Sequence, residues 1–325
     1  MKLKNLYRPL IVITVAGLLF VACKKSSSTD NANTSDADVQ TQSDDQSRVS
    51  SENDAVTNDV NTTMSDQAYV TGSGTPTRGD VQIAGAYEVK SLICDASVTV
   101  DTSNSTRTIT ITYNGGTNCA QTRTRTGVVT ISIPAGVKWS DKGAVVTVSI
   151  QNLKITRILD GKSITINGTH TYTNVSGGSL VDLATLGSIT HTVTSDNMTI
   201  TFDGGAQRSW HIARQRVYSY NNGVVVTESG LHTDGSTTGI TEWGTNRFGN
   251  SFETVFTTPV VVSQSCNWRL TSGVIEVIRP AVTVTLSLGL DSSGNPTGCP
   301  GDGTYYFKLV WQGAGGKTYT FILPY

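Results

Sequence analysis

The chain has 325 residues, of which 37% are hydrophobic and 15% charged, and its 24 basic and 25 acidic side chains leave a formal net charge of −1 at pH 7. This near-neutral balance gives no electrostatic reason to expect a nucleic-acid partner. The length is sufficient for one large domain or two small ones.

The N-terminus has the pattern of an export signal. Three basic residues within the first eight precede an apolar run from 10 to 21, which ends at Ala22 and Cys23. The run is shorter than the roughly 20 apolar residues of a transmembrane helix, so it predicts a cleaved signal peptide over residues 1–22. The stretch 20–23 resembles the lipobox of bacterial lipoproteins, with Phe20 where Leu is usual. That resemblance implies a lipid on Cys23.

A lipid on Cys23 would hold the chain to a membrane. Each buried methylene group contributes about 0.8 kcal/mol, so several acyl chains make the attachment effectively permanent. Lys24 follows the cysteine where inner-membrane retention would call for Asp. By analogy with lipoprotein sorting we therefore expect the outer membrane, with the periplasmic and cell-surface faces both open.

Residues 23–80 are predicted to form the lipidated cysteine and a disordered tether. From 26 to 80 the chain is dominated by Ser, Thr, Asp, Asn and Gln, with ten acidic side chains, two arginines and one aromatic residue, Tyr69. Such a composition buries too little apolar surface to offset the conformational entropy lost on folding. A passive acidic spacer is the favoured interpretation, and a binding role for the acidic run is the alternative.

Residues 81–325 are predicted to form a single all-β domain. Apolar side chains alternate with Thr and Ser in stretches such as 109–113 and 146–150, and this period of two indicates strands with one apolar face. Between such stretches stand Asn-Gly and Asp-Gly pairs, which favour tight antiparallel hairpins; they begin at residues 114, 160, 167, 203, 222 and 234. We expect a long antiparallel meander of about 14–16 strands, curled or folded into two layers as a sandwich or a trough, with no significant helix outside the signal peptide.

Four further cysteines predict two disulfides, as expected for an exported chain. Cys94 and Cys119 bracket one predicted hairpin, and Cys266 and Cys299 bracket another. The first residue of a strand lies opposite the last residue of its antiparallel partner, within reach of a disulfide. We therefore expect Cys94 to pair with Cys119 and Cys266 with Cys299. A zinc site is disfavoured because no Cys-x-x-Cys motif or nearby His supports it.

The predicted domain carries several short motifs: the closing Gly-Cys and Tyr-Thr-Phe patterns and the stretches 127–132, 143–148, 160–161, 167–174 and 265–268. These motifs resemble those of the uncharacterised all-β lipoproteins that are abundant in Bacteroidetes. The resemblance covers most of residues 90–325. The family brings no known activity, so the resemblance implies an all-β fold and an envelope location without implying a function.

One predicted strand carries a possible binding face. Six side chains between residues 208 and 220 share one parity and therefore one side of the strand: Arg208, Trp210, Arg214, Arg216, Tyr218 and Tyr220. Arginines over aromatic rings could bind an anionic glycan or a lipid headgroup. The alternative is a solvated sheet face on which these side chains pack as cross-strand pairs. The arginines of the stretch 122–126 are open to the same two interpretations.

No catalytic, metal or cofactor site is predicted. Asp291, Ser293, Asn295 and Asp302 have the spacing of calcium-loop ligands, but Pro296 stands where such a loop needs Gly, which favours an ordinary polar hairpin loop. The four histidines have no acid or nucleophile at a recognisable spacing, and neither a Gly-x-Ser-x-Gly nor a His-Glu-x-x-His motif supports catalysis.

We expect a non-enzymatic envelope lipoprotein whose β-sheet domain has a structural, adhesive or ligand-binding role, with a glycan or an envelope protein as possible partner. Two alternatives stay open. An apolar β-trough would handle lipid or lipopolysaccharide. A cleft with a suitably spaced carboxylate pair would make a glycan-degrading enzyme.

Overall fold

The computed structural model describes residues 36–66, 86–89, 91, 93–118, 121–266, 268–280, 282–299, 304–312 and 316–324. The predicted signal peptide and Cys23 lie outside these ranges, as do residues 24–35 and 67–80 of the predicted tether. Among the helices that are described, none is long and apolar enough to cross a membrane.

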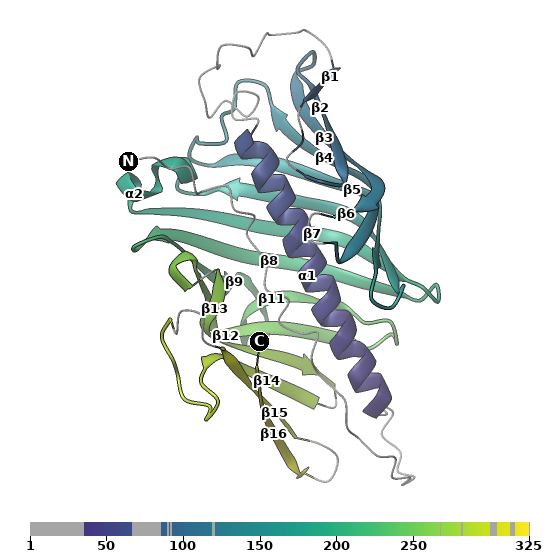
Figure 1. Cartoon of the computed structure of the whole chain (residues 1–325), viewed down its shortest axis with the longest axis vertical. Coiled ribbons are helices and arrows are strands. Elements are labelled where there is room, and N and C mark those ends of the chain that lie inside the picture. Colours follow the sequence, from purple (N-terminus) through teal and green to yellow (C-terminus); the bar gives the residue numbers. More distant parts are fainter. Residues whose placement is uncertain are drawn as a thin grey trace.

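Within the described residues, sixteen strands form one antiparallel sheet, which confirms the predicted all-β fold (Figure 1). From β1 to β8 and from β11 to β16, each strand pairs with the next along the chain. Strand β8 also pairs with β9 and β11, β9 pairs with β12, and β10 pairs with β11. The first eight strands are β1 (Ala86–Val89), β2 (Ala96–Asp101), β3 (Thr106–Thr117), β4 (Arg123–Pro134), β5 (Ala144–Arg157), β6 (Ser163–Asn174), β7 (Ser188–Phe202) and β8 (Gln207–Tyr220). The other eight are β9 (Val224–Gly230), β10 (His232–Asp234), β11 (Thr237–Thr245), β12 (Ser251–Ser263), β13 (Arg269–Arg279), β14 (Val282–Leu290), β15 (Tyr306–Gln312) and β16 (Thr318–Pro324).

The Asn-Gly and Asp-Gly pairs have two different structural roles. The pairs that begin at residues 160, 203, 222 and 234 lie between strands, and the turn residues Gly161 and Asn222 have φ of 69° and 53°. The pairs at 114 and 167 instead lie inside β3 and β6, where the strand register shifts. The prediction of a hairpin turn is therefore wrong at those two places. A β-bulge and a tight turn both use residues that tolerate positive φ, so the dipeptide alone does not separate them.

A long helix, α1 (Asp36–Asp66), lies across one face of the sheet (Figure 1). We call this the inner face. Val49, Val56, Val60 and Met64 of α1 belong to the same buried cluster as the alternating apolar side chains of β2–β8. Their spacings of seven, four and four residues place them on one side of a helix. The short helices η1 (Leu180–Asp182), α2 (Leu183–Leu186) and η2 (Gln264–Cys266) lie between strands.

Helix α1 corrects two predictions. The disordered tether expected over residues 23–80 is wrong for residues 36–66, and the expected absence of helix outside the signal peptide is wrong for α1. The physical reason is that composition measures only the apolar surface within the segment, whereas the sheet supplies partners from far along the chain. Polar α1 side chains are buried against it as well, among them Asp45, Arg48, Glu52 and Thr57.

One predicted disulfide is confirmed. Cys266 and Cys299 are bonded with a Cα–Cα distance of 5.2 Å, and they bracket the β13–β14 hairpin as expected. Cys94 is also disulfide-bonded. Cys119 lies outside the described residues, so its pairing with Cys94 stays a prediction.

Shortening an α1 valine should destabilise the whole domain. Val56 is 1% exposed, so Val56→Ala removes buried methyl groups from the interface between α1 and the sheet and should lower the free energy of unfolding by roughly 1–3 kcal/mol. Urea denaturation would measure the change. The control is Val145→Ala in β5, where the valine is 42% exposed and the change should stay within about 0.5 kcal/mol. Equal stability of the two variants would show that α1 does not pack on the sheet in solution.

Candidate functional site on the inner face

Acidic side chains of α1 meet arginines of the sheet at intervals of seven residues. Asp45 pairs with Arg247 in the β11–β12 turn. Two turns further along the helix, Glu52 pairs with Arg123 at 2.5 Å. After another two turns, Asp59 accepts a hydrogen bond of 2.6 Å from Arg125. Seven residues advance an α-helix by about 10.5 Å and return to nearly the same side, so these acids form one stripe.

The stripe ends at a buried ion network. Arg125 donates two hydrogen bonds to Asp95, of 2.8 and 2.6 Å, in addition to its contact with Asp59. Tyr113 also donates to Asp59, at 2.8 Å, and the Arg125 guanidinium lies 4.3 Å from the centre of the Tyr113 ring. Burial raises the pKa of Asp59 above its usual value, against the opposing effect of Arg125. The arginine is therefore held between a carboxylate of the sheet and one of the helix.

The six residues of the predicted binding face share one side of β8, as their parity indicates. That side is the inner face, and α1 covers much of it: Arg208 is 1% exposed and Trp210 is fully buried. Tyr218 is also buried, whereas Tyr220 at the strand end is exposed. Arg208 and Trp210 are therefore neither an open binding surface nor exposed to solvent. Binding of a ligand there would require α1 to move.

Two arginines of this face pair with carboxylates on neighbouring strands. Arg214 forms an ion pair with Glu242 of β11 and lies 3.6 Å from Glu228 of β9. Arg216 contacts the same Glu228 at 2.9 Å. These side chains are mutually neutralised inside the sheet, so they form cross-strand pairs, one of the two interpretations that the sequence left open.

Two arginines, Arg247 and Arg208, act on the carboxylate of Asp45. Arg247 donates two hydrogen bonds to it, both of 2.5 Å, and Arg208 lies close enough to act on it electrostatically. The Arg247 guanidinium lies 3.8 Å from the centre of the Phe202 ring, and that of Arg208 lies 4.0 Å from the centre of the Phe252 ring. Two arginines held over aromatic rings thus act on one carboxylate, Arg247 by direct hydrogen bonds and Arg208 through its charge, an arrangement suited to anion recognition.

Two buried donors on the inner face of β8 have no hydrogen-bond partner among the described residues. They are the Nε of Arg208 and the Nε1 of Trp210. Arg208 also donates to the side-chain oxygen of Gln46 on α1 at 2.5 Å. Burial lowers the pKa of Arg208 to about 10, so this guanidinium remains charged at neutral pH. A buried donor without an acceptor costs about 1–3 kcal/mol, which leaves the site able to gain from an added acceptor.

The apolar part of the inner face continues beyond α1. Phe256 of β12 is paired in register with Ile275, Ile275 with Leu286, and Leu286 with Leu309 of β15. The Arg214 guanidinium lies 5.7 Å from the centre of the Phe256 ring, which places this row on the same face as the arginines of β8. The cluster around it contains no described side chain of α1, and its half-buried members include Ile275, Leu286 and Trp311. Below we call it the C-terminal cluster.

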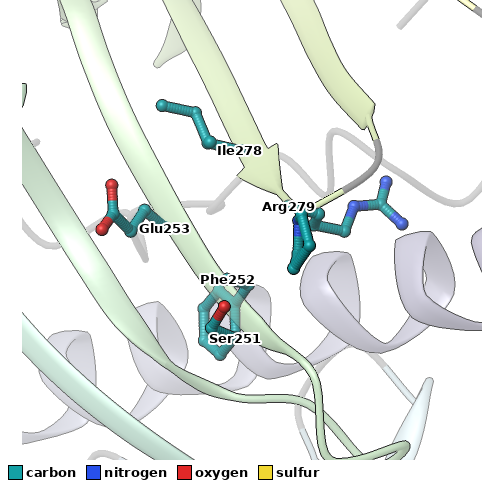
Figure 2. A pocket seen from close by; sticks show the side chains of 6 residues that line it. Ser251, Phe252, Glu253, Ile278 and Arg279 are labelled. Atoms are coloured by element: carbon teal, nitrogen blue, oxygen red, sulfur yellow. The ribbon is translucent and has the colours of Figure 1, made fainter.

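A small pocket lies where β12 and β13 come together. It has a volume of about 200 Å³ and is lined by Ser251, Phe252, Glu253, Ile278, Arg279 and Pro280. Figure 2 shows that Glu253 points away from Arg279, so the two charged side chains of the pocket do not converge. This arrangement does not form an acid–base pair. Phe252 and Arg279 nevertheless connect the pocket to the inner face.

Two of the four histidines are buried in the sheet, and two stack on its other face. His170 is fully buried, and neither of its ring nitrogens has a described hydrogen-bond partner. Burial and the nearby Arg214 and Arg216 lower its pKa to about 3, and burial lowers that of His191 to about 4. His211 and His232 stack on Trp243, with ring centres 5.2 and 3.8 Å away. Within the described residues, no group of three or more His, Cys, Asp or Glu is placed to hold a metal ion.

The predicted calcium-like loop is held by its own backbone. Asp291 accepts hydrogen bonds of 2.8 and 3.0 Å from the backbone N–H groups of Ser293 and Asn295. These bonds lower the pKa of its carboxyl group. Asp302 lies outside the described residues. The described part of the loop is an Asp-stabilised turn, which agrees with the simpler interpretation of the sequence.

Comparisons with known proteins identify no relative of this chain. No protein-family model matches it, no curated protein matches it, and no solved structure matches it. The resemblance to the Bacteroidetes lipoproteins therefore stays a prediction.

Sequence reasoning found the arginines of β8 but missed the helix α1, which covers the inner face. The missed residues are Asp45, Glu52 and Asp59 on α1, and the signal that could have found them is their spacing of seven. Val49 and Val56 have the same spacing. Read together, an acidic and an apolar stripe on adjacent sides would have indicated an amphipathic helix within a polar segment.

The buried histidines predict that acid destabilises the fold. In the folded state, both histidines have a pKa well below the roughly 6.5 of a histidine in an unfolded chain. As the pH falls below 6.5, the unfolded state therefore binds protons before the folded state does. The free energy of unfolding should therefore decrease from pH 7 to pH 5, with a slope of up to about 1.4 kcal/mol per pH unit for each histidine.

Replacing one histidine should remove its share of this slope. Denaturant unfolding of His170→Leu at several pH values should show a shallower decrease than the parent chain, because all other titrating groups are common to both proteins. His191→Leu gives an independent repeat. Parallel pH profiles for parent and His170→Leu would contradict the assignment of the slope to His170.

Proposed function

We propose that this chain is a lipid-anchored envelope protein whose inner face binds an acyl-chain-bearing molecule, such as a lipid or a lipopolysaccharide, without transforming it chemically. The observation that carries the proposal is the C-terminal cluster. It offers Phe256, Ile275, Leu286 and Trp311 on one face of β12–β15, and no described apolar side chain of α1 belongs to it. An extended apolar surface of this kind is typical of a site for a partner or an apolar ligand.

The curled sheet supports an elongated ligand in preference to a compact one. The apolar row crosses four strands, which lie about 4.8 Å apart, so it extends for roughly 14 Å. In Figure 1, α1 lies lengthwise over the same sheet and crosses most of its strands. The inner face therefore already accommodates a rod-shaped body, the α1 helix.

The state of the carboxylates favours binding over catalysis. Asp95, Glu228 and Glu242 of the sheet and Asp45 and Asp59 of α1 each contact an arginine. A general acid or base needs a proton that it can exchange with a substrate, and an arginine-paired carboxylate is poorly suited to this. A structural or adhesive role, with a glycan or an envelope protein as partner, is the second reading of the same sheet.

The anchor is proposed on the sequence of residues 1–23, with the outer membrane as location. Cys23→Ser should abolish acylation and release the protein from the membrane fraction, because the lipid supplies the membrane affinity. Metabolic labelling with a radioactive fatty acid, followed by fractionation, would measure both effects. A Cys23→Ser protein that still sediments with membranes would contradict lipid anchoring. Protease added to intact cells would then show on which face of the outer membrane the parent chain lies, because only a cell-surface domain is accessible to the protease.

Binding of an apolar probe tests the proposed site. The neutral dye N-phenyl-1-naphthylamine should fluoresce on binding to the mature chain, and Leu286→Asp should weaken binding by about tenfold or more, because it places a charge in the apolar row. The matched control is Thr285→Asp, one residue away on the opposite face of β14. No dye binding by the folded parent chain, or equal loss in both variants, would refute the proposed site.

A further inference from the structure

We infer that the ligand of the inner face carries an anionic headgroup, a phosphate or a carboxylate of a single-molecule amphiphile, and that Asp45 of α1 occupies the headgroup's place. The inference rests on the proposed function and adds the chemistry of the polar end. The site for this headgroup consists of Arg208 and Arg247, with Trp210 two residues along the same face of β8.

The first argument is the charge that α1 supplies. The Asp45 carboxylate receives both hydrogen bonds of Arg247 in a bidentate arrangement, the same geometry that arginine adopts with a phosphate. Asp45 is 4% exposed, so α1 has placed an anion inside the protein against the Arg247 guanidinium and within the electrostatic influence of Arg208. The sheet and its turn supply the arginines of this contact, and α1 supplies the carboxylate that another anion could replace.

The second argument is the surplus of donors. With α1 in place, Arg208 Nε and Trp210 Nε1 remain buried without an acceptor among the described residues. A carboxylate has two oxygens, and both oxygens of Asp45 are bonded to Arg247. A phosphate group offers more acceptor oxygens, so it could satisfy Arg247 and also accept from Arg208, whose Nε is unpaired while Asp45 occupies the site.

The third argument is continuity with the apolar row. Arg208 stacks on Phe252, and Phe252 lies on the same strand as Phe256 of the C-terminal cluster. Four residues separate the two phenylalanines, a distance of about 13 Å along a strand. The pocket lined by Phe252 and Arg279 lies at the beginning of β12 (Figure 2). A headgroup at Arg208 and Arg247 would leave an attached acyl chain free to follow the inner face toward Ile275.

Glu242 explains why the site suits one anion at a time. Its carboxylate lies beside Arg208 and forms an ion pair with Arg214, and Gln46 of α1 bridges it to Arg208 by donating to one and accepting from the other. Glu242 thus neutralises part of the positive charge of β8. The charges of Arg247 and Arg208 remain, and Asp45 offsets one of these two while α1 lies on the inner face.

Dodecyl phosphate is a suitable probe because it has one anionic headgroup and one acyl-like chain. Titration calorimetry on the full mature chain, below the probe's micellar concentration, should give binding at least about tenfold tighter than that of the neutral monolaurin. Hydrogen exchange of residues 36–66, followed by mass spectrometry, should accelerate when dodecyl phosphate binds, because α1 leaves the inner face. Inorganic phosphate alone should neither bind with comparable affinity nor accelerate exchange.

Variants at the anion site give the sharper test. Asp45→Asn removes the internal anion and keeps both arginines, so dodecyl phosphate should bind about tenfold more tightly than to the parent chain. The control is Asp182→Asn, the same change at an exposed position in η1. In the Asp45→Asn background, adding Arg247→Gln should reverse the gain, because the bidentate donor is lost while the competing carboxylate is already absent.

The outcomes separate this inference from the function on which it rests. Equal affinities for dodecyl phosphate and monolaurin, or equal effects of Asp45→Asn and Asp182→Asn, would overturn the anionic headgroup while leaving binding of the neutral dye intact. Comparable binding of inorganic phosphate would indicate a free anion as ligand and overturn the amphiphile. Failure of the neutral dye and of both amphiphiles to bind would instead remove the proposed function itself.

Discussion

The structure depends on how the arginines of the inner face are neutralised. Moving a guanidinium from water into a protein interior costs several kcal/mol unless a carboxylate accompanies it. Asp95 and Glu242 do this for Arg125 and Arg214 from within the sheet. Arg247 relies on Asp45 of α1 instead. The helix is therefore part of the electrostatic balance of the sheet, and a segment with few apolar residues can dock because the sheet needs its charges.

Along the order of the strands, the inner face has two regions that differ in their buried charge. From β2 to β8 the face combines apolar rows with buried arginines, and α1 supplies valines for the former and acids for the latter. From β12 to β16 the central row of the face is apolar and contains no arginine, and Arg279 lies at the end of β13 beside the pocket. The boundary passes through Arg208, Phe252 and Phe256. A molecule that is charged at one end and apolar along its length matches the two regions in the order in which they occur.

Local patterns predicted the sheet well because strand identity is a property of neighbouring residues. The period of two is visible in stretches such as 109–113, and Cys266 and Cys299 mark the ends of a hairpin that forms between sequence neighbours. Docking of α1 is of another kind, since Asp45 and Arg247 are 202 residues apart in the chain. No window of sequence contains both. The parity of Arg208 and Trp210 correctly placed them on one face of β8. Parity gives no information on which segment covers that face, so the position of α1 became known only from the structure.

Covalent linkage of α1 to the sheet determines how a ligand would compete with it. A segment of the same chain has an effective concentration that does not depend on how much protein is present, commonly in the millimolar range for short flexible connections. A ligand must therefore bind the uncovered face more tightly than α1 does at that concentration, and its observed affinity is reduced by the small uncovered fraction. The buried polar side chains of α1 lose hydration when the helix docks, and this loss reduces the free energy that a competing ligand must exceed. A helix with a continuous leucine stripe would bury more apolar surface and be harder to displace, whereas the Val49, Val56 and Asp45 arrangement combines limited apolar burial with a charge that another anion can replace.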